Sequence, residues 1–183
     1  RVTPHDVVAV FGCGGVGLGA VAGAAFRGAT VVAVDLDDAK LETAGRAGAH
    51  HLINTAQSDL HTQLAGLTEG RGPDVILEAI GLPQTFRAAV EEVAFTGRVV
   101  YIGYAKDPVS YETRLFVQKE LDILGSRNAL PDDFHAVIRM LEAGLFPVED
   151  AVTDIVPIRE AAAILEDWKR EAARLTKVKM EVE

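Results

Sequence analysis

The chain has 183 residues, of which 49% are hydrophobic and 25% are charged, a composition typical of a globular domain. Its formal net charge of −9 argues against a nucleic-acid-binding surface, and no apolar run approaches the roughly 18 residues that a membrane span needs. The single cysteine excludes an internal disulfide and favours a reducing compartment. We therefore expect a cytoplasmic protein whose partners are neither nucleic acids nor membranes.

Short apolar strands alternate with helices along most of the chain. The predicted strands are Val7–Phe11, Thr30–Asp35, His51–Ile53, Val75–Glu78, Arg98–Ile102 and Leu121–Gly125. The predicted helices are Val16–Arg27, Asp38–Ala47, Asp59–Thr68, Pro83–Val93, Asp132–Ala143 and Arg159–Trp168, with a shorter one at Arg114–Gln118. This alternation predicts an α/β Rossmann fold: a doubly wound, six-stranded parallel sheet of order 3-2-1-4-5-6 with helices on both faces.

The first predicted strand runs directly into a glycine-rich turn that matches the pattern G-x-G-x-x-G. Gly12 suits a sharp turn, Gly14 lets a pyrophosphate approach the backbone, and Gly17 lets the following helix pack close to the strand. The unpaired N–H groups at the start of that helix, together with the helix dipole, favour an anion. The sequence therefore predicts a dinucleotide site whose phosphate-binding turn consists of Gly12, Gly14, Gly15, Val16 and Gly17. The alternative is a glycine-rich turn in an unrelated α/β protein.

An acidic residue at the end of the second strand indicates which dinucleotide is bound. Asp35 lies 18 residues after Gly17, close to the roughly 20 expected for the acid that holds the adenosine ribose. A 2′-phosphate placed about 4 Å from this carboxylate would be repelled by about 4 kcal/mol per unit charge at an effective dielectric of about 20. NAD is therefore favoured over NADP, with Lys40 as a second ribose contact. Asp37 and Asp38 are better explained as the N-cap and first-turn acid of the next helix.

The end of the chain departs from the strand–helix alternation. Residues 166–174 are heavily charged, and Thr176–Val182 alternates polar and apolar residues like a half-buried strand. A seventh strand has no obvious place in the predicted sheet, so we expect it to pair with something outside this chain. We interpret residues 1–183 as a single NAD-binding domain, with the core sheet in residues 1–145 and a C-terminal helix and strand in residues 146–183.

Several motifs of this sequence resemble those of a known family. The runs G-C-G-G-V-G-L-G-A, V-V-A-V-D with Lys40 five residues later, R-A-G-A-H-H-L-I-N, G-P-D-V-I-L-E-A-I-G, G-R-V-V-Y-I-G and K-E-L-D-I-L-G-S-R-N occur in order along nearly the whole chain. Together they resemble the medium-chain dehydrogenase/reductase family, and its zinc-dependent alcohol and polyol dehydrogenases most closely. The stretch from Ser126 to Ala129, followed by Asp133 and Phe134, is similar to the sorbitol, threonine and sugar-acid dehydrogenase branch.

The resemblance implies that this chain is the cofactor-binding portion of a larger enzyme. Family members have a preceding catalytic domain that holds zinc through Cys, His and acidic ligands, and the terminal strand returns to that domain. Here Cys13 is alone and the histidines lack ligand spacing, so we expect no metal site in this chain. The whole enzyme would transfer a hydride from a secondary alcohol or polyol to NAD, whereas this chain alone would be inactive.

The same resemblance assigns residues after the later strands to the nicotinamide end of the cofactor. Residues Ala79, Ile80 and Gly81 would line the nicotinamide side of the crevice, and Ile102, Gly103 and Tyr104 would offer backbone groups to the carboxamide. Next in this series are the residues that follow the sixth strand, Ser126, Arg127 and Asn128. Arg127 could instead simply cap the end of that strand. Ile80 and Ile102 could equally be core-facing strand ends, and for the buried Glu78 we expect a structural hydrogen-bonding role rather than a catalytic one.

The sixth strand, Leu121–Gly125, should lie at the edge of the sheet, where an apolar strand invites pairing with another chain. In the family this edge joins two subunits, so we expect a homodimer through it. Two alternatives to the zinc enzyme remain open. One is a zinc-free, quinone-reductase-like member of the same family, which would usually prefer NADPH and is therefore disfavoured by Asp35. The other is a module that binds NAD as a sensor without catalysis.

Overall fold

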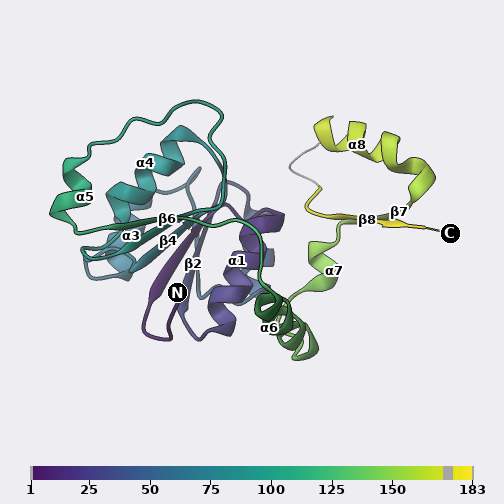
Figure 1. Cartoon of the computed structure of the whole chain (residues 1–183), viewed down its shortest axis with the longest axis horizontal. Coiled ribbons are helices and arrows are strands. Elements are labelled where there is room, and N and C mark those ends of the chain that lie inside the picture. The colour runs from purple at the N-terminus through teal and green to yellow at the C-terminus, as the bar shows by residue number, and fades with distance from the viewer. Residues whose placement is uncertain (1, 171–174, 183) are drawn as a thin grey trace. The chain divides into compact units, whose positions relative to one another are not determined.

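The computed structural model describes residues 2–170 and 175–182. It divides into two compact units, Arg1–Phe146 and Pro147–Glu183, which are treated separately below (Figure 1). None of the described helices is long and apolar enough to cross a membrane.

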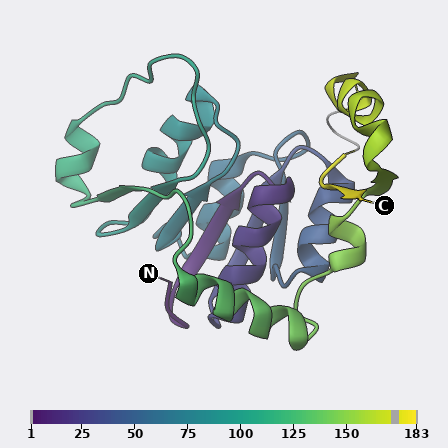
Figure 2. The ribbon, with the colours of Figure 1, turned by 45° about the vertical axis from the view of Figure 1, so that its right-hand side comes forward.

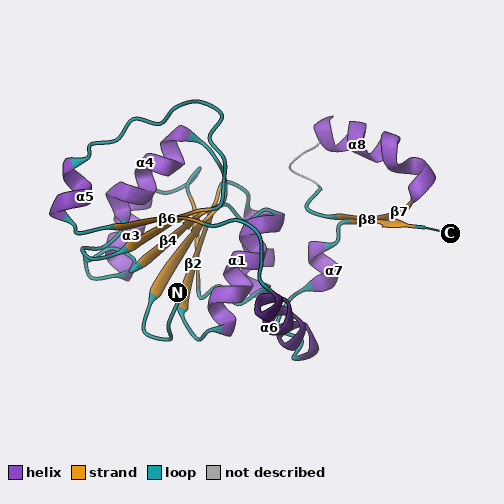
Figure 3. Ribbon diagram, in the orientation of Figure 1, coloured by secondary structure: helices purple, strands orange, loops and turns teal. Residues whose placement is uncertain are grey.

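The first unit is a parallel sheet flanked by helices (Figure 3). Its strands are β1 (Val7–Phe11), β2 (Thr30–Asp35), β3 (His51–Asn54), β4 (Val75–Glu78), β5 (Arg98–Tyr101) and β6 (Asp122–Gly125). Its helices are α1 (Gly15–Phe26), α2 (Asp38–Arg46), α3 (Leu60–Leu67), α4 (Pro83–Glu92), α5 (Arg114–Gln118) and α6 (Pro131–Glu142). The strand order is β3-β2-β1-β4-β5-β6 and every neighbouring pair is parallel, which confirms the predicted topology and places β6 at an edge.

The central strands are apolar on both faces because helices cover both sides of the sheet. On one face, Ala9 and Phe11 of β1 belong to a buried cluster with Leu64 of α3 and Ala89 of α4. Side chains alternate along a strand, so Val8 and Val10 point to the opposite face, where α1 packs on β1 and β2 and also contacts α2 (Figure 2). The carboxyl ends of all six strands therefore lie at one edge of the sheet, with β1 and β4 adjacent at its centre.

Local signals in the sequence account for where several helices begin and end. Asp37 is the N-cap of α2 and accepts hydrogen bonds from the backbone N–H groups of Ala39 and Lys40 (2.8 and 3.2 Å), which confirms the capping role expected for it. Asp59 caps α3 rather than lying within it, because its side chain accepts from the Thr62 N–H at 2.8 Å. Gly28 follows α1 with φ +82°, the left-handed conformation that ends many helices.

The second unit contains α7 (Val148–Ala151), β7 (Asp154–Pro157), a 3₁₀ turn η1 (Ile158–Glu160), α8 (Ala161–Arg170) and β8 (Val178–Glu181). The expectation that the terminal strand lacks a partner in this chain was wrong, because β8 pairs with β7 in parallel. β7 was missed because four residues ending in a proline are too few for an alternating pattern to be recognised. Residues 171–174 of the charged segment lie outside the described residues.

Candidate functional site

The glycine-rich turn connects the buried strand β1 to helix α1. Gly12 adopts φ +90°, and the Cβ of any larger residue at Gly17 would overlap the Gly12 carbonyl oxygen, so both positions require glycine. Gly14 is different, because no atom lies within 4 Å of the place where its Cβ would be. Gly14 is also the N-cap of the 12-residue α1 and gives it no side-chain cap. The turn thus presents uncapped N–H groups next to open space, which suits an anion.

Asp35, at the end of β2, is hydrogen bonded to this turn. Its Oδ2 accepts from the Cys13 N–H at 2.7 Å, and its Oδ1 accepts from the N–H groups of Leu36 and Asp37 at 2.7 and 3.2 Å. A carboxylate offers about four acceptor positions, so roughly one remains for a ligand. Asp35 therefore orients the glycine-rich turn as well as offering a negative charge to the crevice.

A cavity of about 730 Å³ opens at the carboxyl ends of the strands, beside this turn. The predicted site residues that line it are Gly12, Gly14, Asp35, Lys40, Ala79 and Ile80. Ligand pockets in proteins are commonly about 300–1,000 Å³, so the size suits a small molecule or a large part of a dinucleotide. The structure thus brings together the turn, the acid of β2 and the start of the loop after β4.

The other predicted residues do not line this cavity. Gly15, Val16 and Gly17 form the first turn of α1, beside it. Gly81, Gly103 and Tyr104 pack against one another where the loops after β4 and β5 meet, and Ile102 follows the last residue of β5. Arg127 lies in a separate hollow of about 290 Å³ that also contains Asn128 and Asp133.

Sequence reasoning missed residues that line the cavity on the side of β3 and α4. They are Leu36, Thr55, Ser58, Asp59, Leu60, Leu82, Gln84, Thr85 and Ala88. The loop after β3 is held by Asp38 of α2, whose two carboxylate oxygens accept from Asn54 Nδ2 (2.6 Å) and Gln57 Nε2 (2.9 Å). For Leu36 and Thr55, each the first residue after a strand, that position was the available signal, because ligands bind outside the carboxyl ends of parallel strands.

Cys13, within the glycine-rich turn, is a buried structural residue. Burial first and the nearby Asp35 charge second raise the pKa of its thiol to about 12, and its Sγ lies 3.8 Å from the Val34 carbonyl oxygen. A thiol with so high a pKa is a poor nucleophile and a poor metal ligand. Across the described residues, no cluster of three or more His, Cys, Asp or Glu side chains could hold a metal ion.

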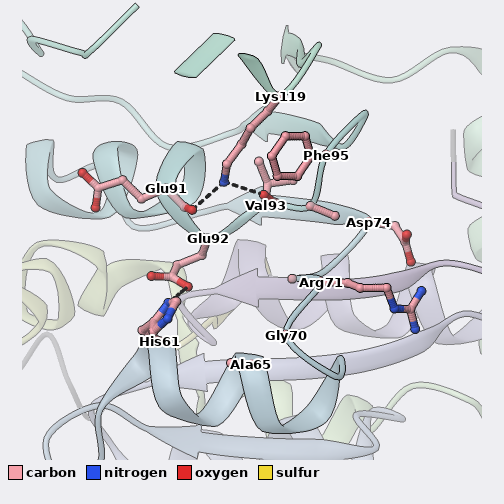
Figure 4. A pocket seen from close by; sticks show the side chains of 12 residues that line it. His61, Ala65, Gly70, Arg71, Asp74, Glu91, Glu92, Val93, Phe95 and Lys119 are labelled. Atoms are coloured by element: carbon pink, nitrogen blue, oxygen red, sulfur yellow. Dashed lines mark hydrogen bonds and ion pairs between the residues drawn. The ribbon is translucent and has the colours of Figure 1, made fainter. Parts of the chain in front are cut away.

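A second cavity, of about 480 Å³, lies between α3 and α4 at the amino ends of the strands, opposite the glycine-rich turn (Figure 4). The charged groups drawn there are largely paired within the protein. His61 Nδ1 is 3.0 Å from Glu92 Oε2, and the Lys119 ammonium donates to carbonyl oxygens at the end of α4, including those of Glu91 (2.6 Å) and Val93 (2.8 Å). Among the described residues that line this cavity, none belongs to a helix N-terminus without a side-chain cap, since α3 is capped by Asp59, so the cavity at the turn is the better candidate for an anion.

Comparison with known proteins assigns the chain to a family. Residues 15–143 match the family model described as zinc-binding dehydrogenase, and the chain belongs to this family. It is 33% identical over 162 residues to the erythritol/L-threitol dehydrogenase of Mycolicibacterium smegmatis, covering 87% of this chain and 44% of that protein. It is 29% identical to the sorbitol dehydrogenase of Bacillus subtilis, covering 91% of this chain and 47% of that one. The chain thus spans about half the length of these curated relatives.

Solved structures of related proteins have the same fold. An alcohol dehydrogenase from Thermus sp. ATN1 superposes with a TM-score of 0.87 at 32% identity, covering 99% of this chain and 52% of that one. An alcohol dehydrogenase from Escherichia coli CFT073, solved in complex with NADH, superposes with a TM-score of 0.86 at 28% identity, covering 98% and 53%. The resemblance to zinc-dependent alcohol and polyol dehydrogenases inferred from the motifs is therefore confirmed.

Proposed function

We propose that this chain is the cofactor-binding part of an NAD-dependent dehydrogenase that oxidises a secondary alcohol or polyol. The observation that carries the proposal is the hydrogen bond from the Cys13 N–H to Asp35 Oδ2 (2.7 Å), because it fixes a negative charge beside an open, uncapped glycine turn. A dinucleotide needs both features, one for its pyrophosphate and one for its ribose.

Each part of the site has a distinct role in this proposal. The backbone around Gly14 holds the pyrophosphate at the N-terminus of α1, and Asp35 accepts a ribose hydroxyl with its remaining acceptor position. Lys40, which lines the same cavity, contacts the ribose. Residues Ala79–Gly81 and Ile102–Tyr104 form the nicotinamide end. The cofactor, once bound, accepts the hydride, and the chain's own task is to orient it.

The substrate and the catalytic zinc would belong to the rest of a longer protein. The relatives named erythritol/L-threitol and sorbitol dehydrogenase are about twice as long as the matched segment, which supports a separate catalytic domain. In this proposal residues 1–145 supply the cofactor sheet, and residues 146–183 lead back to the catalytic domain. A cytoplasmic location suits a chain whose one cysteine is free and buried.

The exposed edge of the sheet supports the proposal of a homodimer. Every residue of β6 is exposed, including Ile123 (38%) and Leu124 (45%), although such side chains are usually buried. Pairing β6 with its copy would extend the sheet across two subunits. Sedimentation at micromolar concentration should show a dimer, and a monomer alone would contradict this part of the proposal.

Binding and activity assays of the 183-residue chain test the proposal. We expect NADH to bind, NADPH to bind much more weakly, and secondary alcohols not to be oxidised by this chain alone. A preference for NADPH would instead favour a zinc-free reductase. Oxidation of an alcohol by the purified chain would contradict the division of labour proposed here.

A further inference from the structure

Glu78, the last residue of β4, is a completely buried acid at the centre of the sheet. It lies at the carboxyl end of the strand, at the edge where the candidate site opens. A charged or polar side chain in such a place is costly unless the protein supplies partners for it.

The partners of Glu78 come from the loop that follows its own strand. Its Oε1 accepts hydrogen bonds from the backbone N–H groups of Ile80 (3.0 Å) and Gly81 (2.9 Å), and from the Thr85 hydroxyl (2.7 Å). Its side chain therefore fixes the start of the loop that leads from β4 to α4. The hydrogen-bonding role expected for this residue is confirmed.

The backbone of Glu78 holds a second loop, the one after β5. Its carbonyl oxygen accepts from the N–H groups of Ile102 (2.9 Å) and Gly103 (3.0 Å). A Cβ added to Gly103 would lie 2.5 Å from the Gly81 nitrogen and 2.6 Å from Glu78 Oε2. The two loops are therefore in direct contact, with the Glu78 carboxylate packed against Gly103 at their junction.

The second carboxylate oxygen of Glu78 is not needed to hold the loop. Oε2 is buried and, within the described part of the chain, has no hydrogen-bond partner. If this position served stability alone, we would expect either an acid with both oxygens hydrogen bonded or an apolar residue. A buried acid with one oxygen lacking a hydrogen bond is unfavourable. What the acid does provide is one strong acceptor that three donors share.

We propose that Glu78 is a positioning residue that sets the nicotinamide end of the site. It acts through Ile80 and Gly81, and through their contact with Gly103, to keep the two loops in the spacing that receives the nicotinamide ring. This inference rests on the proposed function, because it assumes that a dinucleotide binds at the glycine-rich turn. Glu78 itself is too buried to touch the cofactor.

Titration with two ligands tests this assignment. ADP-ribose contains the adenosine and pyrophosphate parts of NADH and lacks the nicotinamide, so it engages the turn, Asp35 and Lys40 without a ring at the nicotinamide end. Replacing Glu78 with alanine should weaken NADH binding about tenfold, as expected for loss of a shared charge-assisted acceptor, and leave ADP-ribose binding nearly unchanged. Glu78→Gln keeps an acceptor oxygen and should restore most of the NADH affinity.

The controls separate positioning from general damage. Glu91→Ala, at an exposed position of α4, should change neither affinity. NADH fluorescence adds a signature, since a ring that is not held should emit like free NADH even when the rest of the molecule is bound. If Glu78→Ala does not fold, Gly103→Ala takes its place, because its Cβ would force the loops apart while keeping the acid, and the same loss confined to NADH is expected.

The outcomes are distinguishable. If the unmodified chain binds neither ligand, the proposed function fails. If the unmodified chain binds both, the inference about Glu78 is overturned when the variants lose NADH and ADP-ribose equally, when they lose neither, or when Glu78→Gln fails to restore NADH binding.

Discussion

The carboxylate of Asp35 accepts a hydrogen bond from the backbone N–H of Cys13 at 2.7 Å, which joins the end of β2 to the glycine-rich turn after β1. The acid predicted to recognise the ribose is therefore also part of the structure that shapes the phosphate-binding turn. A substitution at Asp35 should therefore affect both the ribose contact and the phosphate-binding turn. Different replacements are needed to separate these two effects.

Replacing Asp35 should weaken NADH binding and reduce discrimination against NADPH. Asp35→Ser removes the charge and shortens the side chain, and we expect a loss of about 1.5–3 kcal/mol, or roughly tenfold to hundredfold, in NADH affinity. Asp35→Asn keeps one acceptor oxygen, which can serve the Cys13 N–H, but it removes the charge and puts an NH2 donor in place of the other oxygen. It should retain more NADH affinity than serine does and still gain NADPH affinity, as measured by calorimetry. Unchanged selectivity in both variants would contradict the assigned role.

Gly17 and Gly19 form a matched pair for testing the close contact between helix and turn. Gly17→Ala would place a Cβ on the Gly12 carbonyl, so the helix must shift and we expect a large fall in melting temperature and loss of NADH binding. Gly19→Ala lies in the same helix with open space around the added Cβ, and it should stabilise the helix by about 0.5–1 kcal/mol. Equal effects of the two substitutions would be inconsistent with the structure.

The contact between His61 and Glu92 should make stability depend on pH. The Glu92 carboxylate raises the pKa of His61 above 6.5. A group whose pKa is raised on folding stabilises most below its unfolded pKa, so this contribution is full below about pH 6.5 and disappears as the pH rises through the higher folded pKa. The His61 side chain is 75% exposed, although that of Glu92 is only 14% exposed, so solvent screens the pair and the effect should be small.

NMR titration of the histidine ring protons measures this directly. The pKa of His61 should fall in Glu92→Gln, while the other four of the five histidines should be unaffected. The difference in melting temperature between the two proteins should be larger at pH 6 than at pH 8. A His61 pKa that does not respond to the substitution would rule out the contact.

Cys13 should be unreactive until the chain unfolds. Its pKa is raised from 9.0 to about 12, so at any pH well below 9 the folded chain holds about a thousandfold less thiolate than the unfolded one. A thiol reagent at pH 8 should therefore label the native chain very slowly and the chain in denaturant rapidly. Rapid labelling of the native chain would show that the turn is more open than described.

The sequence was informative where one strong local pattern decided the structure. The glycine-rich turn and Asp35 predicted a binding site beside the first strand, where the strand order of the sheet reverses. The alternation of apolar strands and helices predicted the strand order itself, because right-handed crossovers leave few alternatives. It was uninformative about β7, where four residues ending at Pro157 gave no periodic signal.

The features of the candidate site that the sequence did not predict depend on hydrogen bonds between residues far apart in the chain. The bond from Cys13 to Asp35 joins residues 22 positions apart, and the bonds from Asn54 and Gln57 to Asp38 join residues 16 and 19 apart. Spacing placed Asp35 in the site but could not show that three backbone N–H groups already occupy most of its acceptor positions. The sequence indicated that Glu78 is a buried acid. It could not show that Glu78 holds the loops after β4 and β5 together, because that contact depends on the register of the two strands.

A crystal structure of the chain grown with NADH would test the central claim most directly. We expect the pyrophosphate against the backbone of Gly14 at the start of α1, and a ribose hydroxyl within hydrogen-bonding distance of Asp35 Oδ2. A dinucleotide bound elsewhere, or an Asp35 carboxylate turned away from the ribose, would contradict the account.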